Sequence, residues 1–195
     1  CVRRCGVSMD SYVEIKLRPD PEFAPQLLLN ALMGKLHRGL VLAETSAIGI
    51  SFPDNTDKPR SLGQRLRLHG AASELGGFME GRWLAGMSDH VTVSVVQPLP
   101  EVVGHRVVRR VQPKTNAERL RRRYQRRHDV SAEEARRLIP DSVEQSVSLP
   151  FVTLRSASTD QRFALFVSHG PIQGEATAGV FNSYGLSQSA TVPWF

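Results

Sequence analysis

Several features that would commit a chain to a compartment or a fold are missing from this sequence. Its two cysteines, Cys1 and Cys5, both lie within the first five residues, so they cannot cross-link anything further along. No window approaches the roughly 18–20 uninterrupted apolar residues that a membrane span requires. The first residues also lack the apolar segment of a signal peptide. We therefore predict a cytoplasmic protein with no membrane partner.

Motifs of several catalytic classes are missing as well. The sequence holds no phosphate-cradling GxxxxGK loop, no GxGxxG fingerprint, no CxxC pair and no HExxH zinc motif. We therefore expect neither a metal nor a cofactor. The segment Arg65-Leu66-Arg67-Leu68 also lacks the aromatic residues with which RNA-recognition motifs stack single-stranded bases.

Positive charge is what the sequence has in excess. The net charge is +6 and the sequence pI is about 9.9, which favours nucleic acid or an acidic membrane surface as partner, and of these two we expect nucleic acid. Residues 106–128 contain nine arginines and Lys114, whereas Glu118 is the only acidic residue before the final histidine. This basic segment predicts a polyanionic partner.

The second half of the basic segment is expected to be a helix. Thr115 and Glu118 have the spacing of a capping box, and Leu120 with Tyr124 forms an i,i+4 apolar pair that would dock on a core. A solvated basic helix is the alternative, although such helices usually mix Glu with Arg. The arginines left to track phosphates are Arg119, Arg122, Arg123, Arg126 and Arg127.

Hydrophobic periodicity predicts an α+β protein. We set residues 1–8 aside as an extension or cloning remnant and expect a ferredoxin-like (RRM-like) domain over residues 9–100. Its order would be strand, helix, strand, strand, helix, strand, the split-βαβ pattern. The expected strands are 12–17, 47–52, 64–69 and 90–96, the first helix runs from about Pro25 with Leu29, Leu32, Leu36 and Leu40 buried, and Ser73 would cap the second.

A proline-containing stretch at residues 97–100 marks the expected domain boundary. We expect residues 101–195 to form a smaller α+β domain that bears the arginine-rich helix. A further helix would be capped by Ser131 and end before Pro140. Residues 151–154 and 162–167 would then form a hairpin.

The remaining polar residues suit metal-free cleavage of RNA. The ribose 2′-hydroxyl is itself the nucleophile, so the protein has to position it, move its proton and stabilise the developing charge. Histidine suits the proton transfer because its unperturbed pKa is near 6.5. Composition does not say which of the six histidines acts.

The sequence contains the stretches RPDPEF, LMGKLHRGL, RVQPKTNAERLRRRYQRRHDVSAEEARRLIPD, LPFVTLRSASTDQRF and SYGLSQSATVPWF. Together they resemble a known family, the CRISPR-associated endoribonuclease of subtype I-F, and the resemblance runs from Met9 to Phe195. It implies an enzyme that cuts precursor CRISPR RNA at the base of a repeat hairpin without metal and stays bound to the product. It also implies a free monomer that joins other subunits of an RNA-guided surveillance complex.

The resemblance assigns three catalytic residues. His37, in GKLH, would transfer the proton, and Ser156, after FVTLR, would hold the 2′-hydroxyl or constrain the ribose. Tyr184 would orient the histidine and the ribose. The structural alternatives are a helix histidine packed beside Met33, a turn serine and a half-buried aromatic.

RNA recognition is assigned by the same resemblance. Arg110 and Gln112 would read a guanine and an adenine at the foot of the stem, although a basic loop held on phosphates is the alternative. Phe163 would stack on the terminal base pair, or else pack in the core beside Leu165. The helix face laid in the hairpin's major groove would consist of Arg122, Arg123, Arg126 and Arg127.

Two other functions fit the same residues. A catalytically silent RNA-hairpin binding protein would use the same arginine helix. A DNA-binding regulator would use the two helices around Val130 as a helix-turn-helix. Deoxyribose substitution separates the three, because it abolishes cutting by the nuclease, changes little for the RNA binder and is irrelevant to a reader of duplex DNA.

Overall fold

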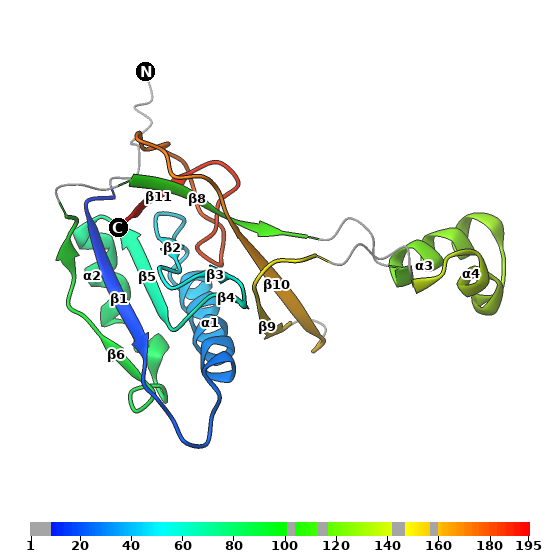
Figure 1. Cartoon of the computed structure of the whole chain (residues 1–195), viewed down its shortest axis with the longest axis horizontal. Helices are drawn as coiled ribbons and strands as arrows, with labels where there is room; N and C mark the ends of the chain where they lie inside the picture. The colour runs from blue at the N-terminus through cyan, green and yellow to red at the C-terminus, as the bar shows by residue number, and fades with distance from the viewer. Residues whose placement is uncertain (1–8, 101–103, 113–116, 142–146, 157–159) are drawn as a thin grey trace. The chain divides into compact units, whose positions relative to one another are not determined.

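The chain divides into two compact units, which are described separately. The computed structural model describes residues 9–100, 104–112, 117–141, 147–156 and 160–195. The large unit comprises Cys1–Arg110 and Leu149–Phe195, and the arginine unit comprises Val111–Ser148 (Figure 1). The domain boundary predicted at residue 100 concerns which segments fold independently. The division into compact units does not test this, so the boundary stays a prediction.

The first sheet of the large unit is antiparallel. Its order is β2-β5-β1-β6, with β7 also paired to β1. The predicted hairpin of the second and third strands is confirmed, because β2 and β5 are directly paired. The strands are β1 (Ser11–Leu17), β2 (Gly49–Ser51), β5 (Arg65–Gly70), β6 (Val91–Val93) and β7 (Gln97–Pro98).

The fourth predicted strand, residues 90–96, was too long. β6 ends at Val93, after which the Ser94 hydroxyl oxygen accepts the Glu14 backbone N–H at 2.9 Å. A side chain thus replaces a backbone acceptor, and Val95 beyond it is 76% exposed. The Ser94 N–H still donates to the Glu14 carbonyl at 2.9 Å, so the alternation of the sequence continues past the last residue of regular strand pairing.

Two helices pack against the apolar face of this sheet. Helix α1 (Pro25–Leu42) begins with a proline in its first turn, where no backbone donor is lost. Its predicted leucine stripe is buried in one core with Val13 and Ile15 of β1. Helix α2 (Ala72–Glu80), followed by the 3-10 turn η1 (Arg82–Leu84), adds Leu75 and Phe78 to that core.

Helix α2 starts one residue before the predicted cap, Ser73. Ala71 is the N-cap residue and contributes no side-chain hydrogen bond. The carboxylate of Asp10 instead accepts the Ala72 N–H at 3.2 Å. The cap therefore comes from a residue distant in sequence, which a local capping pattern does not reveal.

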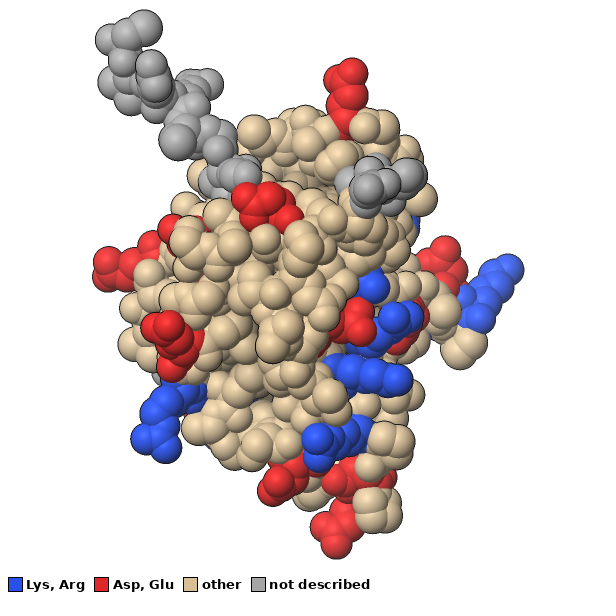
Figure 2. Space-filling model, turned by 90° about the vertical axis from the view of Figure 1, so that its left-hand side faces the viewer, with Lys and Arg blue, Asp and Glu red and all other residues tan. Residues whose placement is uncertain are grey.

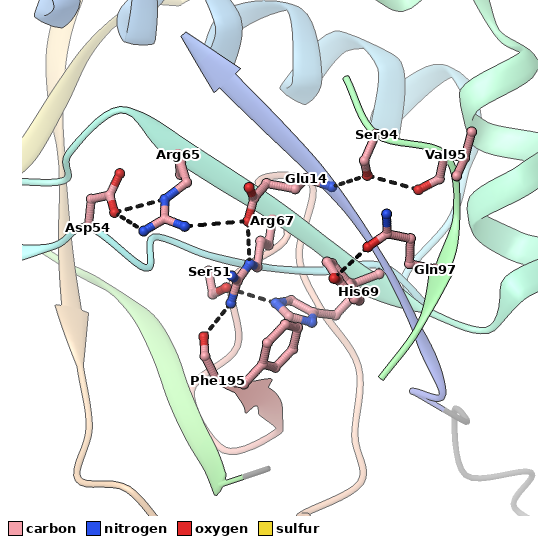
Figure 3. A network of polar contacts seen from close by, with 11 residues as sticks. Glu14, Ser51, Asp54, Arg65, Arg67, His69, Ser94, Val95, Gln97 and Phe195 are labelled. Carbon is pink, nitrogen blue, oxygen red and sulfur yellow. Dashed lines mark hydrogen bonds and ion pairs between the residues drawn. The ribbon is translucent and has the colours of Figure 1, made fainter. Parts of the chain in front are cut away.

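The opposite face of the first sheet is polar and covered (Figure 3). Arg67 donates to Glu14 at 2.8 Å and to the carbonyl of Phe195, whose ring centre lies 4.1 Å from the guanidinium. His69 Nε2 lies 2.7 Å from the Ser51 hydroxyl, and its side chain is fully buried. This face of the sheet is therefore not an open platform for stacking bases.

The second sheet of the large unit has the order β11-β8-β10-β9. The predicted hairpin of residues 151–154 and 162–167 is confirmed, because β9 and β10 pair antiparallel with Leu165 opposite Val152. The chain is thus mixed α+β, as expected. The strands are β8 (Gly104–Val111), β9 (Phe151–Arg155), β10 (Arg162–His169) and β11 (Thr191–Trp194), and β3 (Thr56–Asp57) pairs separately with β4 (Arg60–Ser61).

The arginine unit contains two helices, α3 (Ala117–His128) and α4 (Ala132–Leu138). The predicted cap of the second is confirmed, because the Ser131 hydroxyl accepts the Glu134 N–H at 3.1 Å. Thr115, the predicted cap of α3, lies outside the described residues. The buried residues of the two helices are small: Ala117 of α3 and Ala135 of α4.

Lys and Arg are unevenly spread over the surface. Figure 2 shows the side of the molecule on which α2 and β6 lie, and most of that surface carries neither a positive nor a negative residue. In the described residues no helix is long and apolar enough to cross a membrane. Exposed arginines on α1, the second sheet and α3 are therefore the candidates for a polyanion site.

Candidate active site

A groove in the large unit brings together the three predicted catalytic residues. His37 of α1, Ser156 at the end of β9 and Tyr184 all line it, together with Phe163 of β10. Its volume is about 880 Å³, within the roughly 300–1,000 Å³ of ligand pockets. Segments more than a hundred residues apart in sequence therefore meet at one site.

His37 is held in a defined tautomer. It is half-buried on α1, and its Nδ1 lies 2.8 Å from the backbone carbonyl oxygen of Ser183. A carbonyl oxygen only accepts hydrogen bonds, so Nδ1 carries the hydrogen and donates it. In the neutral ring, Nε2 then keeps its lone pair and is the atom that can accept a proton.

Tyr184 supports the same imidazole from its face. The two rings are stacked, with centroids 4.2 Å apart and planes 11° from parallel. The Asn182 side-chain oxygen accepts the backbone N–H groups of Tyr184 at 2.9 Å and Leu186 at 3.2 Å. This turn therefore presents both the tyrosine ring and the Ser183 carbonyl to His37.

Gly185 anchors the turn to the first sheet. Its φ of +72° is one that side chains rarely adopt, and an added Cβ would lie 2.6 Å from the Ile50 side chain. The Gly185 carbonyl also accepts the Ile50 N–H at 2.9 Å. The position of the tyrosine thus depends on β2 as well as on the turn.

Ser156 is positioned through the contact between α1 and β9. The Asn30 side-chain oxygen accepts the Thr153 N–H at 2.9 Å, and Gln26 donates to the Phe151 carbonyl at 3.0 Å. Because β9 is the last strand of its sheet, these helix side chains satisfy its outer backbone groups. The helix that carries His37 is therefore tied to the strand that leads to Ser156.

Arg110 lies against the aromatic residues of the site. Its guanidinium carbon is 5.6 Å from the ring centres of both Phe163 and Tyr184. In the part of the chain that the structure describes, its buried Nε has no hydrogen-bond partner. Phe163 both lines the groove and packs against the core, so its core-packing alternative is also observed.

The arginine unit contains both an arginine that is bonded within the unit and arginines that are exposed. Arg121 is held inside the unit, donating to the Ile139 carbonyl at 2.9 Å and to Asp141 at 2.7 Å. The predicted RNA-binding residues of this unit are exposed, and of these Arg122 approaches Glu118 at 3.4 Å. The exposed set consists of Gln112, Arg122, Arg123, Arg126 and Arg127.

Two other histidines of the large unit, His69 and His169, are less suited to proton transfer. Burial and the nearby Arg67 lower the pKa of His69 to about 3, and burial and Arg106 lower the pKa of His169 to about 4. His90 lies 2.9 Å from the Asp20 carboxylate. Across the described ranges, His, Cys, Asp and Glu form no group of three that could hold a metal ion.

Sequence reasoning missed residues that build the groove. Asn30, Gly34, His37 and Val41 are spaced i, i+4, i+7 and i+11, so the helical period places them on one face. That spacing could have identified the helix wall of the groove. The bond from Asn30 to β9 and the Ser183 carbonyl had no signal in the local sequence. The cations that line the groove, also missed, are Lys35, Arg38, Arg155 and Arg162.

These features define a class of protein. A basic α+β chain with a proton-accepting imidazole in a cation-lined groove has the chemistry of a nucleic-acid-processing protein. The comparisons with known proteins are specific. Residues 12–195 match the family described as CRISPR-associated protein (Cas_Csy4). The chain therefore belongs to the Cas_Csy4 family.

Two relatives cover nearly the whole chain. Both are named CRISPR-associated endonuclease Cas6/Csy4, and one is from Pseudomonas aeruginosa, the other from Escherichia coli. The first is 51% identical and the second 44% identical to this chain, each over 96% of this chain and 100% of the relative. The expected family is confirmed, and the chain is a CRISPR-associated endonuclease.

Proposed function

We propose that this endonuclease cuts precursor CRISPR RNA at the base of its repeat hairpin, without metal, and stays bound to the product. The observation that carries the proposal is the His37 imidazole, whose Nδ1 donates to the Ser183 carbonyl while its ring stacks on Tyr184. This arrangement leaves Nε2 available for the proton transfer that RNA cleavage requires.

The proposed reaction gives each of the three catalytic candidates in the groove a role. The ribose 2′-oxygen attacks the adjacent phosphorus while the bond from phosphorus to the 5′-oxygen breaks, so the upstream RNA ends in a 2′,3′-cyclic phosphate and the downstream RNA leaves with a protonated 5′-hydroxyl. A 3′-phosphate end results only where water afterwards opens the cyclic phosphate. His37 transfers the proton, and Ser156 holds the 2′-hydroxyl or constrains the ribose. Tyr184 fixes the orientation of the imidazole, and orientation of this kind can account for a large part of a rate enhancement.

Recognition uses residues outside the reacting atoms. Arg110 and Gln112 read the guanine and the adenine at the foot of the stem, and Phe163 stacks on the terminal base pair. Exposed arginines of α3 contact the hairpin's major groove, which is open near the ends of a short stem. These arginines are Arg122, Arg123, Arg126 and Arg127.

The proposal also covers the domains of the enzyme, its location in the cell and its partners. Residues 9–100 form a ferredoxin-like domain, which the strand order β2-β5-β1-β6 and the helices after β1 and β5 support. Residues 101–195 form the smaller domain for RNA recognition. The enzyme is cytoplasmic and monomeric when free, and other subunits of the RNA-guided surveillance complex are its partners.

The proposal is tested by incubating the protein in excess EDTA with an end-labelled CRISPR repeat hairpin. The same RNA with one 2′-deoxy residue upstream of the expected cut, and the variant His37→Ala, are the controls. We expect cleavage of the all-ribose RNA by the unchanged protein, and none in either control. Binding measured in parallel should be retained in both.

Other results would change the assignment. Binding without cutting of the all-ribose RNA would replace the nuclease by the hairpin-binding protein. Cutting of the 2′-deoxy RNA would exclude attack by the 2′-hydroxyl. Cleavage that survives His37→Ala would remove His37 from the reaction.

A further inference from the structure

We propose that the groove along α1 binds the single-stranded RNA that follows the cut, on the leaving-group side. This inference rests on the proposed function and concerns a part of the substrate that the hairpin contacts do not reach. It assigns a role to residues of the groove other than the three catalytic candidates: Asn30, Gly34, Arg38 and Arg162.

The groove extends well beyond the catalytic candidates. Its lining runs along α1 from Leu27 to Leu42. At about 1.5 Å of rise per residue, these fifteen steps cover roughly 22 Å. His37 lies within that length, so a strand that enters the site has room to continue along the helix.

Charge complementarity identifies the occupant as a polyanion. Four of the lining residues are cations, and none of the sixteen is Asp or Glu. Arg155 is paired with Asp160, and Lys35 donates to the Ala85 carbonyl. By contrast, the side chains of Arg38 and Arg162 form no hydrogen bond or ion pair with any residue that the structure describes, and both are exposed. Two unpaired cations beside a cleavage site favour phosphates from outside the protein.

The shape and lining of the groove suit a single strand. Apolar residues at its two ends are strongly exposed, with Leu27 at 58%, Val41 at 50% and Leu42 at 84%. Unstacked bases have apolar faces that such side chains can cover, whereas a duplex buries its bases. The stem on the upstream side is paired, so the strand available to the groove is the one downstream of the cut.

Gly34 keeps the middle of the groove open. A Cβ added there would meet only the Arg38 side chain, at 4.0 Å, so the position faces open space. Glycine inside a helix costs about 1 kcal/mol relative to alanine. The absence of a side chain at this position therefore serves the groove and not the stability of α1.

The test uses the 2′-deoxy hairpin, which binds without being cut, with either one or about five nucleotides after the cut site. For the unchanged protein we expect the long tail to tighten binding about fivefold, as two exposed charge contacts would. The plot of log affinity against log salt should steepen by about 1.4, since each single-strand phosphate adds roughly 0.7. The double variant R38Q/R162Q should bind both RNAs equally.

Two further variants test whether the tail needs the open space of the groove and whether any nearby positive charge would suffice. Gly34→Gln fills the groove and adds helix propensity, so we expect it to fold and to lose the advantage of the tail. Arg82→Gln removes an exposed cation of η1 that does not line the groove, and it should keep the advantage.

The inference is overturned if the tail changes neither affinity nor salt slope in the unchanged protein. It also fails if R38Q/R162Q and Gly34→Gln keep the full tail effect, because the tail then lies elsewhere. Failure of the proposed function looks different: the all-ribose hairpin would remain uncut, whatever the length of its tail.

Discussion

At the scale of single residues, the contact that the structure shows between Tyr184 and His37 is made by the tyrosine ring. The structure gives His37 a stacked neighbour at 4.2 Å, and the bond to its Nδ1 comes from a backbone carbonyl. Aromatic stacking depends on the ring and persists without the hydroxyl. We therefore propose that Tyr184 acts mainly as a support for the imidazole.

We expect Tyr184→Phe to retain most of the cleavage rate, whereas Tyr184→Ala should lose about 100-fold, the effect of misplacing a catalytic group by about 1 Å. Single-turnover cleavage of the repeat hairpin measures both. Equal losses in the two variants would show that the hydroxyl acts directly. Hairpin affinity serves as the control for folding.

A buried histidine makes stability depend on pH. The folded-state pKa of His69 is about 3, below the ordinary value of 6.5, because burial and then Arg67 disfavour its charged form. As the pH falls below about 6.5, the unfolded chain binds a proton that the folded chain does not. Stability therefore decreases with falling pH until about pH 3, and His169 acts in the same direction.

We expect the free energy of unfolding to fall by about 2 kcal/mol between pH 7 and pH 5 on account of His69. Urea denaturation at both values measures it. The variant His69→Gln should show a smaller decrease over the same interval. An identical decrease in this variant would mean that His69 does not cause the effect.

At the scale of elements, the turn that carries Tyr184 depends on one glycine. Gly185 combines a positive φ with an approach to Ile50 that leaves no room for a Cβ. Any side chain there must move either the turn or β2. The Ser183 carbonyl would move as well, and the hydrogen bond that sets the tautomer of His37 would be weakened.

Gly185→Ala should therefore reduce cleavage at least tenfold and lower stability by more than about 1 kcal/mol. Gly76→Ala is the matched control, because a Cβ on that glycine of α2 meets nothing within 4 Å. We expect this control to gain up to about 1 kcal/mol and to cleave normally. Thermal unfolding and single-turnover cleavage test both, and a fully active Gly185→Ala would contradict the role of the turn.

At the scale of the whole molecule, RNA binding is expected to depend on which arginines are exposed and which are bonded within the protein. The net charge of +6 says nothing about which arginines are structural. In the arginine unit, Arg121 has a side chain only 11% exposed and joins α3 to the residues after α4, whereas Arg126 is exposed.

We expect Arg126→Gln to weaken hairpin binding and to reduce the salt slope by about 1, without changing thermal stability. Arg121→Gln should instead lower the melting temperature, because the Ile139 carbonyl and Asp141 lose their donor. Titrations over a range of salt, paired with thermal melts, distinguish the two. The assignment fails if Arg121→Gln alters the salt slope alone.

The sequence by itself determined the elements. Alternation over residues 12–17 and the leucines of α1 specified their structures because such patterns bury one face. The Ser131 cap was equally local, since donor and acceptor lie three residues apart. The prediction failed at two places. At Ser73, the carboxylate of the distant Asp10 accepts the first N–H of the helix. Beyond Val93, the Ser94 hydroxyl accepts the N–H of the distant Glu14.

The tertiary structure alone decided how the site is assembled. A family resemblance predicted three catalytic residues from the sequence, His37, Ser156 and Tyr184. It did not predict the hydrogen bonds and ring contacts that hold them in place. The Ser183 carbonyl fixes the His37 tautomer, and Asn30 ties α1 to β9, across 146 and 123 residues. Contacts at such separations leave no periodic trace in a sequence, because a backbone carbonyl is the same chemical group at every residue.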